Sequence, residues 1–284
     1  MTAAPAPVHA FEEQVIRATR GWASFNLGEL WRYRELLFFF AWRQVLVRYK
    51  QTVLGVAWAI LQPFFLMVVF TIFFGRLANL STSGNPQPLF YYSALVPWFL
   101  FATSLGQGAN SLVGNANLLR KIYFPRLVLP ASAVIAAIID FVIALTVLVA
   151  MMAFYGYYPR LDAVYALPGA VLLAVVTALG ASTFLSALNV AYRDVAYVLG
   201  FLTQGWMFAT PALYLGGDAL DEPWRTLVGL NPMNGVVETF RWALLGAGEA
   251  PGRMVAASAA VSVVLLVVGT AYFRRQERTF ADVV

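Results

Sequence analysis

Charged and apolar residues separate along this chain into long blocks. A basic stretch ends at Lys50, and no formal charge then occurs between Gln51 and Arg76. That run is about 25 residues long, and about 20 apolar residues suffice for a helix to cross the hydrocarbon core of a bilayer. The boundary at Lys50 therefore predicts a point where the chain enters a membrane.

Six apolar blocks of this kind follow one another, and each is long enough to span a bilayer at about 1.5 Å per residue. They lie near residues 53–75, 89–113, 127–155, 164–190, 196–215 and 254–273. We therefore predict an all-α polytopic membrane protein with six transmembrane helices in residues 51–284. A flexible cytoplasmic tail is expected at 1–28, and an interfacial amphipathic helix at 29–50.

Composition supports this class, because 61% of the residues are hydrophobic and only 12% are charged, against about a quarter in soluble domains. The net charge of +5 comes from cations at the ends of apolar runs, where membrane lipid and topology explain them, so no nucleic-acid partner is expected. The chain has no cysteine and one histidine, His9. Disulfides, thiolate chemistry and a histidine metal site are excluded, and no metal is expected.

The cations also predict an orientation. Fourteen of the 19 lysines and arginines fall before the first block, in residues 120–126, at Arg193 and after the last block, and five fall on the other side. Since cations are retained on the cytoplasmic side of short loops, both termini are expected to be cytoplasmic in a bacterial inner membrane. Glu12 and Glu13 precede the first block, which is not typical of a cleaved export signal.

Three segments do not read as membrane spans. Residues 29–50 group charges on one sector of a helical wheel, which fits a helix lying in the interface, either as a surface anchor or as a gate. Residues 115–130 predict a short cytoplasmic helix from about Asn115 to Phe124, which Pro125 ends; its basic residues either anchor topology or accompany a docking surface. Residues 216–252 predict two short outer helices with a turn at Asn231–Asn234, either re-entrant or a packed extracellular cap.

Asp140 is the one acidic residue deep inside an apolar block. A carboxylate at this depth indicates either proton coupling or a structural group satisfied by a neighbour such as Ser132 or Thr146. A second buried acid or histidine that would complete a relay is not evident in the blocks.

An ATP site of the phosphate-loop type is excluded, because that motif requires Gly-Lys-Ser/Thr. The chain has two lysines, Lys50 after Tyr49 and Lys121 after Arg120. ATP and magnesium, if they power transport, must bind to a separate polypeptide, and the chain itself is not expected to be an enzyme or to hold a cofactor.

Several motifs in order resemble the ABC-2 permeases that export O-antigen, capsule and teichoic-acid glycans. They are RYKQTVLGVAWAILQP, LLRKIYFPRLVLP, NVAYRDV, ATPALY and LNPM, which together cover the chain from about Leu30 to Phe280. The resemblance implies a homodimer with a channel between the subunits, two copies of a nucleotide-binding ATPase subunit, and a lipid-linked glycan as substrate.

The resemblance also implies roles for particular residues. Those expected to couple to the ATPase are Asn117, Leu118, Leu119, Arg120, Lys121, Ile122, Tyr123, Phe124, Pro125 and Arg126. Those expected on the substrate path are Trp58, Phe64, Phe65, Trp206 and Phe208, for which simple packing is the alternative, and those at the outer gate are Trp224, Asn231 and Pro232. An ABC-2 drug or small-lipid exporter is the alternative within transport; an ion channel or an intramembrane lipid enzyme is the alternative outside it.

Overall fold

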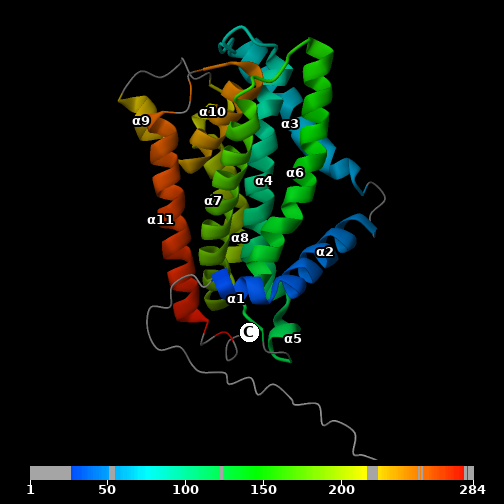
Figure 1. The fold of residues 1–284 in the computed structure, drawn as a ribbon, viewed down its shortest axis with the longest axis vertical. Coiled ribbons are helices and arrows are strands. Elements are labelled where there is room, and N and C mark those ends of the chain that lie inside the picture. Colours follow the sequence, from blue (N-terminus) through cyan, green and yellow to red (C-terminus); the bar gives the residue numbers. More distant parts are fainter. Residues whose placement is uncertain are drawn as a thin grey trace, which may run out of the picture.

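The computed structural model describes residues 27–50, 55–121, 124–215, 223–248, 250, 252–277 and 280, and all regular structure in these ranges is helical (Figure 1). In chain order the helices are α1 (Leu27–Arg32), α2 (Arg34–Lys50), α3 (Ala57–Phe70), the π-helix η1 (Thr71–Leu77), α4 (Gln87–Gly114), α5 (Ala116–Leu119), α6 (Val128–Tyr155), α7 (Ala163–Ala191), α8 (Val195–Phe208), the 3-10 helix η2 (Pro211–Leu213), α9 (Trp224–Val228), α10 (Pro232–Leu245) and α11 (Arg253–Gln276). The prediction of an all-α fold is confirmed.

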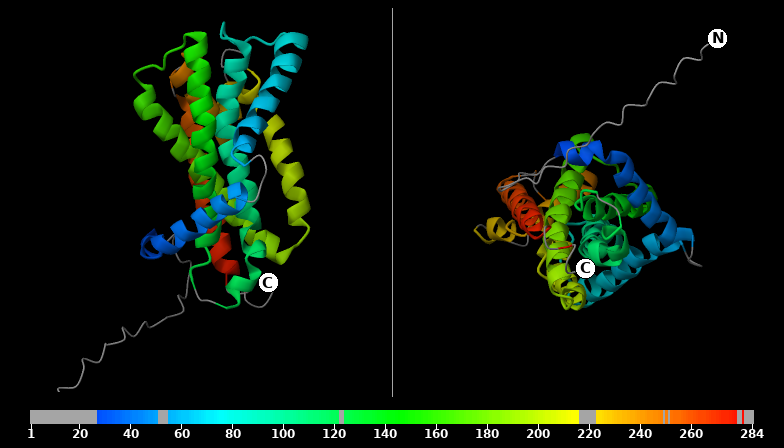
Figure 2. Two further views of the ribbon diagram at one scale, coloured as in Figure 1. Left: turned by 90° about the vertical axis from the view of Figure 1, so that its right-hand side faces the viewer. Right: turned by 90° about the horizontal axis from the view of Figure 1, so that it is seen from below.

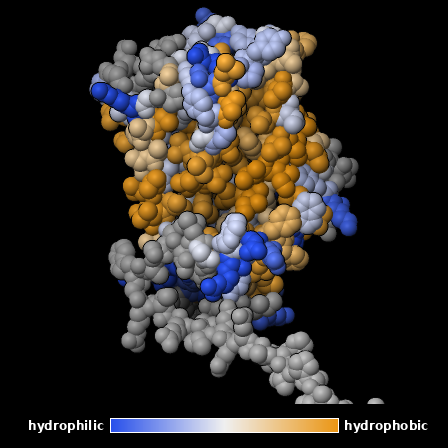
Figure 3. Space-filling model, viewed as in Figure 1, coloured by the Kyte–Doolittle hydropathy of each residue, from blue (hydrophilic) through white to orange (hydrophobic). Residues whose placement is uncertain are grey.

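Five helical segments in the described ranges are long and apolar enough to cross a membrane: α3 continued by η1, and α4, α6, α7 and α11. They run side by side along the long axis of the molecule (Figure 1). On the face seen in Figure 3, hydrophobic side chains cover the middle of the bundle, and hydrophilic residues gather at both ends. These features confirm a polytopic membrane protein, because the apolar middle is the surface that hydrocarbon covers.

The fifth apolar block differs from the expected full-length span. The helix α8 has 14 residues, so it is about 21 Å long, against about 30 Å of hydrocarbon. It ends because Pro211 lacks an N–H donor and biases Thr210 away from helical geometry, and Thr210 indeed adopts φ −109° and ψ 80°. The chain then continues as the single turn η2.

The end of the first span widens into η1, where Gly75 makes room for a side chain from α4. A Cβ at Gly75 would overlap the carboxamide of Gln87, and the Gln87 Nε2 donates to the Gly75 carbonyl oxygen over 3.1 Å. Gln87 therefore satisfies a carbonyl that the π-type hydrogen-bond pattern leaves accessible.

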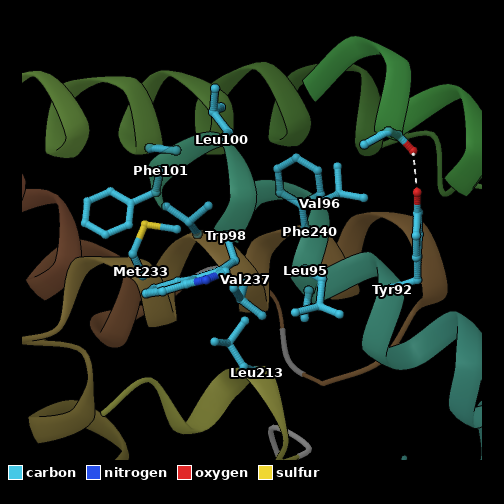
Figure 4. Close-up of a cluster of buried hydrophobic side chains, with 14 of the residues drawn as sticks. Tyr92, Leu95, Val96, Trp98, Leu100, Phe101, Leu213, Met233, Val237 and Phe240 are labelled. Atoms are coloured by element: carbon cyan, nitrogen blue, oxygen red, sulfur yellow. Dashed lines mark hydrogen bonds between the residues drawn. The ribbon is translucent and has the colours of Figure 1, made fainter. Parts of the chain in front are cut away.

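The helix α4 lies at the centre of the bundle and packs against α3, α6, α7, α8 and α10. Figure 4 shows its side chains Leu95, Trp98 and Phe101 within the large hydrophobic cluster, together with Met233 and Phe240 of α10. The Tyr92 hydroxyl in the same helix donates to the Ala144 carbonyl oxygen of α6 over 3.4 Å. This core fixes the positions of the outer helices around α4.

The helices α7 and α11 cross at two glycines. A Cβ at Gly180 would lie 2.6 Å from the Leu266 backbone nitrogen, and one at Gly269 would overlap the Gly180 carbonyl oxygen. Small residues at this crossing let the two backbones approach closely. Close packing matters in a membrane because lipid is as apolar as the helices, so the hydrophobic effect does not drive them together.

The helices α3 and α8 lie on the same side of the bundle, where both pack on α4 (Figure 2). Their outward faces are apolar and open: Phe65 is 71% exposed and Phe201 is 81% exposed. In α8 only Leu199 is buried. This side of the molecule is therefore covered by lipid or by another polypeptide.

Candidate functional site

The helices α1 and α2 lie across the lower end of the bundle, near α5 and the carboxyl end of α11 (Figure 1). The Arg43 Nη1 donates to Asn115 Oδ1 over 3.4 Å, and the Gln44 Nε2 donates to Ser132 Oγ over 2.9 Å. The aromatic residues Trp31 and Phe38 are 72% and 67% exposed. One face of this segment thus binds the bundle, and aromatic side chains remain exposed on its surface.

Asp140 is held by two side chains of α2. Its carboxylate accepts hydrogen bonds from the Arg48 guanidinium and the Tyr49 hydroxyl, and it forms an ion pair with Arg48. The suggested partners Ser132 and Thr146 are wrong, because their hydroxyls donate to the carbonyl oxygens of Leu129 and Ile143, three residues back in their own helix. The carboxylate is therefore part of a connection between α2 and α6.

Burial also changes the proton affinities on the α2 side of this cluster. Desolvation lowers the pKa of the Arg48 guanidinium and raises the pKa of the Tyr49 phenol. Arginine stays protonated through any such shift at neutral pH. The Arg48 guanidinium therefore keeps its charge beside the Asp140 carboxylate, and the Tyr49 phenol adds a second donor.

The loop between α4 and α6 contains a shorter helix than the sequence suggested. We expected helical residues from about Asn115 to Phe124, but α5 covers only Ala116–Leu119. Asn115 separates α5 from α4: it ends α4 at φ −117° and ψ 25°, and its Nδ2 donates to the Ser111 carbonyl oxygen over 2.8 Å. Such local side-chain bonds compete with helix continuation.

The expected coupling residues divide into an outward set and a covered set. Asn117, Arg120 and Lys121 are exposed, and Leu118 and Arg126 are half-buried. Leu119, Phe124 and Pro125 are buried, so the surface that the loop presents is polar and basic. Ile122 and Tyr123 lie outside the described residues.

The buried side of the loop belongs to a second hydrophobic cluster at the lower end of the molecule. Leu119 and Phe124 contribute to it together with Phe40 of α2 and Phe273 of α11. The rings of Phe40 and Phe124 lie 5.6 Å apart. The loop is therefore packed against both the amino-terminal helix and the last helix.

At the upper end, Asn231 connects α8 to α10. It is the N-cap of α10 and accepts from the Met233 N–H and from the Trp206 indole N–H, at 3.2 and 2.9 Å. Its Nδ2 donates to the Ala209 carbonyl oxygen over 2.8 Å and to Thr210 Oγ1 over 2.9 Å. Asn231 and Trp206, which were assigned to a gate and to a path, thus lie in direct contact.

Asn234 adds a second connection between the turn after α8 and α10. Its Oδ1 accepts from the Ala212 N–H over 3.0 Å, and its Nδ2 donates to the Val228 carbonyl oxygen over 2.9 Å. The two asparagines of the motif NPMN therefore tie the turn after α8 to the start of α10. Of the other expected gate residues, Pro232 is buried and Trp224 in α9 is 65% exposed.

Arg241 is buried at the upper end, with 1% of its side chain exposed. Its guanidinium donates to the carbonyl oxygens of Leu215, Leu213 and Phe90 at 2.9, 3.1 and 3.4 Å, and it lies 3.5 Å from the Phe90 ring centroid. Glu238 completes the surroundings at 4.0 Å. A buried arginine of this kind fixes α4, η2 and α10 relative to one another.

The expected path residues separate by environment. Trp58, Phe64, Phe65 and Phe208 are 49%, 45%, 71% and 52% exposed on α3 and α8. Trp206 is half-buried and packs on Phe101, with the ring centroids 4.9 Å apart. The structure thus brings Trp206 into the protein core and leaves the other four rings on the open side.

Sequence reasoning missed the enclosed Arg241, the role of Asn234 and the pairing of Arg48 with Asp140. The signal for Arg241 was an arginine in the mostly apolar stretch before Leu245. The pairing of Arg48 with Asp140 had no local signal, because the two residues are 92 positions apart in the chain.

Together these features define a polytopic membrane domain whose polar contacts gather at the two ends of the bundle. The chain belongs to the ABC-2 type transporter family, which matches residues 35–245. It is 32% identical to the O-antigen export system permease protein RfbA of Myxococcus xanthus over 255 residues, which cover 89% of this chain and 97% of that protein.

Two further relatives extend the comparison. An O-antigen export system permease protein RfbA of Klebsiella pneumoniae is 26% identical over 91% of this chain and 97% of its own length. The polysialic acid transport protein KpsM of Escherichia coli is 23% identical over 83% of this chain and 91% of its own length. The similarity therefore runs through nearly the whole membrane domain.

Proposed function

We propose that this chain is the transmembrane subunit of an ATP-driven transporter that exports a lipid-linked polysaccharide of the O-antigen or capsule type. The observation that carries the proposal is the similarity to the Myxococcus xanthus O-antigen export permease over 97% of that protein. The resemblance to a polysialic acid transport protein points to the same chemical class of cargo.

Deletion of the gene in its own host tests this function. We expect polysaccharide on undecaprenyl-type lipid to accumulate inside the cell while surface polysaccharide disappears. Normal surface polysaccharide together with new sensitivity to toxic small molecules would refute the proposal and favour a drug or small-lipid exporter.

We also propose that the chain forms a homodimer, and the open side of the bundle supports this. The helices α3 and α8 present apolar rings there, and α3 with η1 has only 17% of its membrane window buried. A second copy that faced this side would enclose Trp58, Phe64, Phe65 and Phe208 around a path for the polymer, because ring faces offer apolar contact to the C–H faces of sugars.

Single cysteines test the dimer cleanly, because the chain has none of its own. Phe65→Cys and Phe201→Cys are expected to form cross-linked dimers in membranes. Leu172→Cys on α7 is the matched control, since Leu172 is also an exposed apolar residue, at 63%. Equal cross-linking at Leu172 would contradict the assigned interface.

The ATPase is a separate subunit, present in two copies, and it binds ATP and magnesium. Its docking surface on this chain includes the exposed Asn117, Arg120 and Lys121 at the lower end, so an acidic surface on the ATPase is the expected complement. Lys121→Glu is expected to reduce the amount of ATPase that copurifies, while Arg275→Glu on the exposed end of α11 leaves it unchanged.

The end of the bundle that carries α2 and α5 faces the cytoplasm of a bacterial inner membrane. This orientation agrees with the excess of cations in the segments at that end. Asn117→Cys should react with a membrane-impermeant maleimide only after cells are opened, whereas Tyr158→Cys, at a residue that is 86% exposed, should react in cells whose inner membrane is intact. The reverse pattern would invert the topology.

A further inference from the structure

The carboxyl end of α11 lies against the loop that precedes α6. Glu277 is the C-cap of α11, and Phe280 lies just beyond it. We propose that Glu277 and Phe280 are positioning residues, which hold this loop so that movement of a docked ATPase is transmitted to α6. The inference rests on the proposed function, because it needs an ATPase on the α5 side of the loop.

Glu277 and Arg126 join the end of α11 to the segment just before α6. The Glu277 Oε1 accepts from the Arg126 backbone N–H over 3.3 Å, and the Glu277 carbonyl oxygen accepts from the Arg126 guanidinium. The N-cap of α6 has no side-chain hydrogen bond of its own. A carboxylate near the start of α6 and a guanidinium at the end of α11 both match the helix dipoles. The guanidinium also binds a carbonyl oxygen that the end of α11 leaves without a helical partner.

Phe280 packs against Phe273 and Arg126 at the same contact. It is 1% exposed, its ring centroid is 5.3 Å from that of Phe273, and the Arg126 guanidinium carbon lies 5.7 Å above its ring. Arg126 is thus bound by hydrogen bonds and by a ring face, which fixes the residue two positions before α6 begins.

The opposite side of the loop is fixed to α2. Phe124 packs on Phe40 at 5.6 Å between ring centroids, and Arg43 donates to Asn115. The loop is therefore attached to α2 through Phe124 and Asn115, and to the end of α11 through Arg126.

This attachment matters because α5 is too short to act as a rigid lever. A four-residue helix is marginal without tertiary contacts, since nucleation is costly and few bonds repay it. A push on the exposed residues of α5 reaches α6 as a displacement only if the loop cannot deform. The contacts of Glu277 and Phe280 supply that stiffness on the α6 side.

The test compares four variants of the complex in the host cell and after purification. Glu277→Ala removes the acceptor for the Arg126 N–H, Glu277→Gln keeps an oxygen at that place, and Phe280→Leu removes the ring but retains an apolar side chain. Arg275→Ala is the matched control, because Arg275 is exposed on the same helix end. Export is measured as surface polysaccharide labelled by periodate and hydrazide, and ATP hydrolysis is measured on the purified complex.

We expect Glu277→Ala to lower export about tenfold at equal amounts of complex, because the carboxylate loses its hydrogen bond from the Arg126 N–H and its ion pair with Arg274, while ATP hydrolysis stays within about twofold. Glu277→Gln is expected to restore most of the export, Phe280→Leu to give a smaller loss with the same split, and Arg275→Ala to change neither quantity. The expected result is therefore that less polysaccharide is exported for each ATP hydrolysed.

Unchanged export in Glu277→Ala and Phe280→Leu overturns the proposal. So does a parallel fall of export and hydrolysis, or a loss of assembled complex that Glu277→Gln does not restore, because those results assign Glu277 a role in folding alone. Failure of the proposed function looks different: the unaltered chain would then purify without an ATPase or export no polysaccharide, whatever residue stands at 277.

Discussion

The close crossing of α7 and α11 makes a sharp prediction for a single methyl group. Gly180→Ala places a Cβ 2.6 Å from the Leu266 backbone nitrogen, whereas ordinary van der Waals contact begins at 3.4 Å. The two backbones must therefore separate by about 0.8 Å, and no side-chain rotamer relieves the contact because the neighbour is main chain.

The magnitude follows from two opposing effects. Overpacking of a close contact costs about 1–3 kcal/mol, and alanine recovers up to about 1 kcal/mol of helix propensity relative to glycine. At about 2–4 °C per kcal/mol in a chain of this size, a net loss of about 1–2 kcal/mol lowers the midpoint of thermal unfolding by about 2–8 °C.

The assay is thermal unfolding of the purified protein in detergent, with Gly169→Ala as control. Gly169 lies in the same helix, and a Cβ there meets nothing within 4 Å, so this variant should unfold at the same temperature as the unaltered chain or slightly above it. A midpoint for Gly180→Ala equal to or above that of Gly169→Ala would show that the crossing is not tightly packed and would refute the reasoning.

Three further variants test the polar contacts. Asp140→Asn should destabilise the chain by about 1–3 kcal/mol, because the charged partner Arg48 loses its counterion; adding Arg48→Ala should cost less than the sum of the single changes, and strict additivity in unfolding measurements would deny the pairing. Asn231→Ala should destabilise the chain by about 1–2 kcal/mol, because α10 loses its N-cap. The same change frees the Trp206 indole, so tryptophan emission should shift to the red; unchanged emission would contradict the contact. Arg241→Lys should be as damaging as a neutral replacement, at about 3–5 kcal/mol, because a lysine ammonium cannot reach three carbonyl oxygens in separate directions; near-normal stability of the lysine variant would contradict this.

The membrane spans were predictable because hydrocarbon imposes a length and a composition on each. The four spans that became α4, α6, α7 and α11 agree within a few residues with the apolar blocks. The fifth was overestimated, since hydropathy does not register that Pro211 ends a helix while the chain remains apolar. The two helices before α11 were predictable from the charges and the Asn-Pro step between them, but the turn was placed wrongly at Asn231–Asn234: Asn231 is the N-cap of α10, and Pro232 begins the helix.

The contacts within the candidate site were not predictable, because they join residues far apart in the chain. Nothing local in the stretch around Asp140 indicates that its partners lie in the segment before the first span. The loop residues Leu119 and Phe124 look like a docking face in sequence, yet they are covered by α2 and α11. Only the fold decides which side of a four-residue helix faces outward.

Arg241 also has a consequence for how the protein is made. The carbonyl oxygen of Phe90 and the guanidinium that binds it are 151 residues apart in the chain. At synthesis rates of about 5–20 residues per second, α4 is in place for roughly 8–30 s before Arg241 emerges. During that interval the upper end of the nascent bundle lacks its fastening, and insertion factors or proteases of the membrane have time to act on it. The contact between Arg241 and α4 therefore forms only after α10 has been made, and the contacts of α11 follow it.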